Sequence, residues 1–168
     1  LWERIVLEFP DEEPASADPL IEERRAHDLF VHRLTAFFVG REATLRKLDD
    51  MVSQGSGYVA VTGPSGCGKT ALLANWLYGR DGYAQRHPDT FVLTHFVGAS
   101  ARSTDVREVL LLLCGELAPI ADWAEEIPLD FDELVAMLPR ALEAAARRRP
   151  VLIVLDAVDQ LEQTADAH

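Results

Sequence analysis

The feature that most constrains this 168-residue chain is a glycine-rich segment in its first half. Residues 63–70 read Gly-Pro-Ser-Gly-Cys-Gly-Lys-Thr and match the pattern G-x-x-x-x-G-K-[ST] at every fixed position. A β-rich run, Tyr58–Thr62, precedes the segment, and an apolar helical pattern follows it from Leu72 to Leu77. Glycines let main-chain amides surround an anion closely, and a helix N-terminus adds partial positive charge. The pattern therefore predicts a phosphate-binding loop between a strand and a helix.

Within this loop the residue types suggest separate roles. Lys69 supplies a mobile cation for the β- and γ-phosphates, and the Thr70 hydroxyl is a candidate Mg²⁺ ligand. For Cys67 the simplest interpretation is a small side chain at a variable position, and the alternative is a reactive thiol. The predicted phosphate-binding residues are Gly63, Pro64, Ser65, Gly66, Cys67, Gly68, Lys69, Thr70 and Ala71.

A second candidate element is the apolar run Val151–Leu155, which ends in Asp156. The carboxyl ends of parallel strands share one edge of a sheet, so Asp156 is expected beside the phosphate loop. A carboxylate there would hold Mg²⁺ through a bound water, and the alternative is a cap for the next turn. Asp159 and Gln160 are tentative catalytic residues that would deprotonate or orient a water, although capping fits them equally well.

The pattern of apolar runs predicts an α/β fold. Continuous apolar strands separated by helical segments indicate a parallel sheet that is covered on both faces, giving three layers. Beyond the Tyr58–Thr62 run and the helix after the loop, the expected elements are a helix from Asp18 and Pro19 to about Thr35, a helix over 41–52, a strand over 90–97, a helix capped by Ser103 or Thr104, a helix starting at Asp130 or Asp132, and the strand 151–155.

Charge and composition exclude several function classes. The net charge is −12, which argues against general affinity for nucleic acid or an anionic membrane. The longest apolar runs are far shorter than the ~20 residues that span a bilayer. Two cysteines without metal-binding spacing predict a reducing, cytoplasmic setting. Most of the histidines, His27 among them, are interpreted as scattered without ligand spacing, and His95 as a hydrogen-bonded core residue more than a phosphate sensor.

Three strings together resemble one family. Phe38-Val39-Gly40-Arg41-Glu42, the loop at 63–70 and the run VLIVLDAVDQL at 151–161 resemble the STAND-class P-loop NTPases. They look most like the NACHT-like branch, and residues 95–100 are similar to its nephrocystin-type and telomerase-protein-component-type members. The resemblance implies a P-loop NTPase core that is truncated after the strand ending at Asp156. It also implies that Phe38, Val39 and Arg41 contact the base side of the nucleotide, with core packing as the alternative for Phe38 and Val39.

The function that the resemblance implies is a nucleotide-dependent switch module of a larger signalling or scaffold protein. ATP is the expected nucleotide before GTP, with Mg²⁺ as cofactor. Protein partners would bind through flanking or repeat regions, and the module would form a nucleotide-dependent oligomer. Residues 1–36 are interpreted as an acidic linker with a leading helix, and 37–168 as the N-terminal part of the NTPase domain. Gln160 stands where family members often carry an acid, so slow ATPase activity is left open. The alternatives are a small P-loop kinase and a degenerate structural module.

Overall fold

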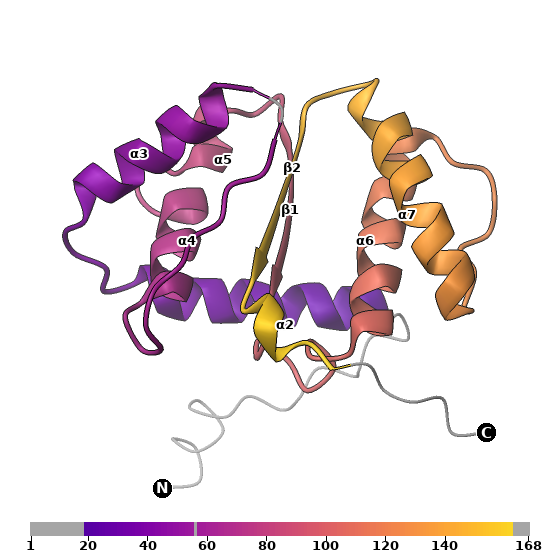
Figure 1. Cartoon of the computed structure of the whole chain (residues 1–168), viewed down its shortest axis with the longest axis horizontal. Coiled ribbons are helices and arrows are strands. Elements are labelled where there is room, and N and C mark those ends of the chain that lie inside the picture. The colour runs from indigo at the N-terminus through magenta and orange to yellow at the C-terminus, as the bar shows by residue number, and fades with distance from the viewer. Residues whose placement is uncertain (1–18, 56, 163–168) are drawn as a thin grey trace, which may run out of the picture.

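The computed structural model describes residues 19–55 and 57–162. Figure 1 shows two strands at the centre, with helices on either side and one long helix, α2, crossing below them. The elements in chain order are α2 (Pro19–Thr35), α3 (Glu42–Ser53), α4 (Lys69–Tyr78), α5 (Tyr83–Arg86), β1 (Phe91–Phe96), α6 (Val106–Ala121), α7 (Phe131–Ala146), β2 (Val151–Asp156) and the 3₁₀ turn η1 (Val158–Gln160).

The two strands pair in parallel, with Phe91 opposite Val151 and Phe96 opposite Asp156. A parallel pair needs a long crossover between its strands, and here α6 and α7 supply it. The predicted α/β class with a parallel sheet is therefore confirmed, although the sheet within the described residues has two strands.

Side chains on the strands alternate between two apolar cores, as the period of a strand requires. Val92 and Phe96 of β1 and Val154 of β2 pack in a cluster with the buried residues of α4. Leu93 of β1 and Ile153 of β2 face the opposite way, into a cluster with α6 and α7. Helices thus cover both faces of the sheet, with α3, α4 and α5 on one side and α6 and α7 on the other (Figure 1).

The predicted strand at Tyr58–Thr62 is wrong. These residues form no ladder in the described part of the chain, and Tyr58 is 97% exposed. Only Val61 of this run packs against the core beside α4. Its β-rich composition favours an extended chain, but a strand also needs a neighbour to accept and donate its backbone hydrogen bonds. β1 and β2 pair with each other, and neither pairs with this run.

Two helix starts test the predicted caps. Helix α7 begins after Asp130, whose carboxylate accepts from the Glu133 amide at 3.0 Å, as predicted. Helix α6 begins after Asp105 and not after Ser103 or Thr104, because the Asp105 carboxylate accepts from the Arg107 amide at 2.8 Å. The cap expected at Asp18 lies outside the described residues.

Candidate functional site

The phosphate loop leads directly into α4. Gly66 and Gly68 have φ values of 74° and 84°, in the left-handed region that glycine enters without a steric penalty. Gly68 is the N-cap of α4 and makes no side-chain cap hydrogen bond. The first amides of α4 are therefore not taken by a capping side chain, which suits this helix end to an anion.

Lys69 lies over the start of this loop. Its ammonium donates to the main-chain oxygens of Gly63 at 3.0 Å and Pro64 at 3.2 Å. The Cys67 amide donates back to Pro64 O at 3.3 Å, which closes the loop into a turn. Thr70 is half-buried in the first turn of α4. The Lys69 ammonium and the main chain of the loop thus lie together at the start of α4, where a phosphate would bind.

A second cation reaches the loop from a distant part of the chain. Arg41 stands before α3, and its guanidinium donates to Cys67 O at 2.5 Å. A Cβ added at Gly68 would lie 3.7 Å from the same guanidinium, so the two residues are in close contact. Of the other predicted base-side residues, Phe38 packs against the core beside α4 and Val39 is 92% exposed. Arg41 is the one of these three that the structure places on the loop.

Asp156 is the last residue of β2 and is 4% exposed. Its Oδ2 atom is buried and has no hydrogen-bond partner among the described residues. The turn that follows begins at Ala157 without a side-chain cap, so Asp156 is not used as its cap. Burying a carboxylate oxygen without a donor costs free energy, and such a group calls for a cation or another partner.

The loop and the acid lie at the same end of the molecule. Figure 1 shows that the carboxyl ends of β1 and β2 point toward the end where the loop enters α4. Asp159 and Gln160 follow on η1 and are exposed. The structure therefore brings the predicted phosphate, magnesium and water-orienting residues to one end of the sheet.

The prediction that His95 is a hydrogen-bonded core residue is confirmed, because its Nε2 lies 2.7 Å from Ser103 O in the buried core. The interpretation of His27 as scattered without ligand spacing needs correction. His27 and His95 are both buried, and their ring centroids lie 4.9 Å apart. Glu23 stands one helical turn before His27 and completes a cluster of three side chains. The spacing Glu23-x-x-x-His27 places both residues on one face of a helix, and this spacing is the sequence signal for the pair. No local pattern links His95 to them.

Comparison with known proteins adds to this geometry. A family model described as an AAA ATPase domain matches residues 38–167. The chain belongs to this AAA ATPase domain family. Its match begins at Phe38, the first residue of the string Phe38–Glu42 that resembles the P-loop NTPases, and it supports ATP binding. The resemblance to P-loop NTPases is thereby confirmed at the level of the superfamily.

Curated relatives of this AAA ATPase domain are much longer proteins. Tetratricopeptide repeat protein 41 of Rattus norvegicus is 32% identical over 59% of the chain. NACHT and WD repeat domain-containing protein 2 of Homo sapiens is 31% identical over 60% of the chain, and a TPR repeat-containing protein of Dictyostelium discoideum is 25% identical over 56%. The matches cover 6–8% of these relatives' own lengths, and they support a NACHT-like P-loop module.

No solved structure matches the chain. In the part of the chain that the structure describes, none of the helices has the length and apolar character needed to cross a membrane.

Proposed function

We propose that this chain is the ATP-binding switch module, of the STAND class, of a larger signalling or scaffold protein. The observation that carries the proposal is the contact between Lys69 and the loop oxygens at the open N-terminus of α4. The complete G-x-x-x-x-G-K-[ST] pattern and the AAA ATPase family match support the same function.

In this proposal the loop amides and Lys69 bind the β- and γ-phosphates of ATP. The Thr70 hydroxyl and the Asp156 carboxylate are the residues that would hold Mg²⁺. Asp156 fits that role because its Oδ2 is buried without a donor from the described residues. When bound, Mg²⁺ would offset the negative charge of the phosphate oxygens.

Arg41 is proposed to connect the nucleotide to the rest of the module. Its backbone precedes α3 and its guanidinium lies on the loop, so a change in loop shape is transmitted to α3. Phe38 and Val39 stay proposed base-side contacts, with Phe38 also serving the core. Asp159 and Gln160 are exposed on η1, where either could meet a water. Gln160 is a poor base, and we therefore expect hydrolysis to be slow.

The module's partners are proposed to bind outside residues 19–162. Relatives are named for tetratricopeptide and WD repeats, which in this proposal correspond to repeat regions of a longer protein. Nucleotide exchange would then control oligomerisation or partner binding. The net charge of −12 argues against a nucleic-acid partner.

The test is calorimetric titration of Mg-ATP into the wild-type chain and into Lys69→Ala. We expect binding by the wild type and a loss of at least about 100-fold in the variant, because a charge-assisted phosphate contact contributes roughly 3 kcal/mol. The control is Lys47→Ala, which removes an exposed lysine on α3. Equal affinity of all three proteins would overturn the phosphate-loop assignment. Rapid phosphoryl transfer to a small acceptor would identify a kinase instead.

A further inference from the structure

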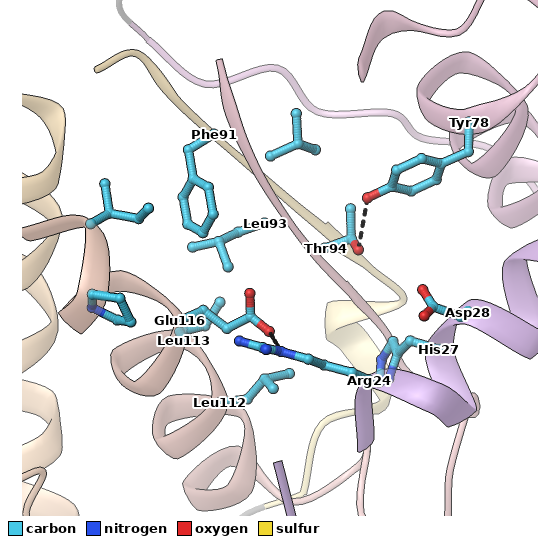
Figure 2. Close-up of a pocket in the computed structure, with 13 residues that line it drawn as sticks. Arg24, His27, Asp28, Tyr78, Phe91, Leu93, Thr94, Leu112, Leu113 and Glu116 are labelled. Carbon is cyan, nitrogen blue, oxygen red and sulfur yellow. Dashed lines mark hydrogen bonds and ion pairs between the residues drawn. The ribbon is translucent and has the colours of Figure 1, made fainter. Parts of the chain in front are cut away.

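A group of titratable side chains lies outside the phosphate loop, where α2 crosses β1. His27 of α2 is 6% exposed, and His95 of β1 is 1% exposed. Glu23 lies one turn before His27 on α2. Figure 2 shows His27 on α2 between Arg24 and Asp28, at the edge of a cavity beside the strand. The nucleotide chemistry proposed above uses none of these three residues.

Each imidazole has one nitrogen fixed by a main-chain carbonyl. His27 Nδ1 lies 2.9 Å from Glu23 O, and His95 Nε2 lies 2.7 Å from Ser103 O. A carbonyl oxygen only accepts, so both of these nitrogens carry the ring hydrogen. The opposite nitrogens, His27 Nε2 and His95 Nδ1, are therefore lone-pair acceptors. Both atoms are buried and have no hydrogen-bond partner among the described residues.

Two lone-pair acceptors cannot hydrogen-bond to each other. The lone pairs of His27 Nε2 and His95 Nδ1 therefore have no donor among the described residues.

The Glu23 carboxylate lies beside the two rings, on the Nδ1 side of His27. Ser100 Oγ lies 2.8 Å from both of its oxygens, and Oε1 is 3.5 Å from His27 Nδ1. One ligand atom from each of the three side chains lies within 4.8 Å of the others. Ligands around a tetrahedral Zn²⁺ are separated by ~3.3–3.5 Å, so small side-chain rotations would close the site.

We propose that Glu23, His27 and His95 form a binding site for a divalent transition-metal cation of the Zn²⁺ class. Two neutral imidazoles and one carboxylate are ligands that such cations prefer, and a water would complete the coordination. The carbonyls of Glu23 and Ser103 orient the rings in the way that outer partners orient metal-bound histidines. The cation would satisfy both lone pairs and offset the carboxylate charge.

The site also has a route to solvent. His27 lines a cavity of 510 Å³ that is bounded by α2, β1 and α6 and contains no residue of the phosphate loop (Figure 2). On one wall Arg24 pairs with Glu116, and on another Tyr78 Oη lies 3.3 Å from Thr94 Oγ1. Of the three proposed ligands His27 lines this cavity, and in the proposal an ion approaches the site from there. Once bound, the cation would fix α2 to β1.

The test uses the whole chain with Zn²⁺ and Co²⁺ as probes. We expect one equivalent of Zn²⁺ by calorimetry, visible d–d absorption with Co²⁺, and a melting temperature raised by at least about 3 °C in Zn²⁺. His95→Gln should weaken Zn²⁺ binding by more than ~100-fold and abolish the Co²⁺ absorption, since loss of an outer partner alone costs 10–100-fold.

Two further variants keep the result interpretable. Glu23→Gln retains an acceptor oxygen for Ser100, so it should keep the fold, which circular dichroism checks. Because it loses the carboxylate charge, its affinity for Zn²⁺ should be at least about tenfold lower than that of the wild type. His32→Gln changes an exposed histidine on the same helix and should bind as the wild type does. Lys69→Ala should also bind Zn²⁺ normally, which separates this site from the nucleotide site. Absence of stoichiometric binding by the wild type, or unchanged binding by His95→Gln, would overturn the proposal.

Discussion

A guanidinium N–H of Arg41 donates to the main-chain oxygen of Cys67 at 2.5 Å, across 26 residues of sequence. The contact joins the residue before α3 to the centre of the phosphate loop. Arg41 has a φ of 65°, in a region that costs a non-glycine residue free energy. The strained backbone places its side chain on Cys67 and against Gly68. The shape of the loop therefore depends on a residue outside it.

Arg41→Ala should weaken Mg-ATP binding about fivefold, because it removes one partly exposed, charge-assisted hydrogen bond of ~1 kcal/mol. Arg41→Gly should lose the same affinity but unfold at higher denaturant than Arg41→Ala, since glycine relaxes the positive φ by about 1 kcal/mol. Calorimetry and urea unfolding measure the two effects. Arg46→Ala, an exposed arginine on α3, is the control. Unchanged affinity in Arg41→Ala would separate this residue from the nucleotide.

Asp156→Asn should separate stability from metal-dependent binding. The buried Oδ2 has no donor within residues 19–55 and 57–162, so removing the charge should leave the nucleotide-free chain as stable as the wild type or raise its melting temperature by roughly 2–4 °C. The gain in ATP affinity that Mg²⁺ provides should disappear. Thermal melts without nucleotide and titrations of ATP with Mg²⁺ or EDTA measure both properties. A lowered melting temperature with intact Mg²⁺ dependence would indicate a structural role.

Local patterns were sufficient to predict much of this fold. Helix α2 ends at Thr35 and β2 begins at Val151, as the sequence indicates, because apolar periodicity and strand composition are properties of neighbouring residues. The loop at 63–70 was found in the same way, since its pattern is continuous. The cap of α7 at Asp130 also follows from a short-range hydrogen bond.

Features that depend on distant partners could not be predicted. The run at 58–62 has the composition of a strand, yet pairing is decided by what lies beside it. The contact between His27 and His95 joins α2 to β1 and leaves no local pattern. The orientation of each imidazole depends on a main-chain carbonyl, which a sequence does not specify. The cap of α6 was missed because Ser103, Thr104 and Asp105 are all capable of that role.

Gly82 should tolerate no side chain. A Cβ at this position would lie 2.4 Å from Leu77 O and 2.9 Å from Tyr78 N, both main-chain atoms that cannot move without disturbing the end of α4. Its φ of −62° suits any residue, so the whole cost of Gly82→Ala is overpacking. We expect a loss of ~3 kcal/mol in the free energy of unfolding, measured with urea.

Gly98→Ala is the matched control for that substitution. Gly98 has a φ of 92° and nothing within 4 Å of an added Cβ, so only its backbone conformation is penalised. The expected loss is about 1 kcal/mol. Equal losses in the two variants would contradict the close approach at Gly82.

Asp49 should make stability depend on pH. Burial by itself would raise the pKa of Asp49, but hydrogen bonds from Arg86 at 2.8 Å and Trp76 at 2.7 Å hold this pKa below its ordinary value of 3.8. A lowered folded-state pKa stabilises the protein above the unfolded-state pKa, and this stabilisation is lost as the pH falls toward the folded-state value.

Asp49→Asn removes the charge and keeps an acceptor for Trp76. It should cost about 1 kcal/mol at pH 7, and the difference from the wild type should shrink below pH ~4. Asp49→Ala also leaves the Trp76 N–H without a partner, so it should cost roughly 2 kcal/mol more at every pH. Urea unfolding of the three proteins at pH 7, 5 and 3.5 measures these differences. If the difference in free energy of unfolding between Asp49→Asn and the wild type does not change with pH, the Arg86 and Trp76 contacts do not lower the pKa of Asp49.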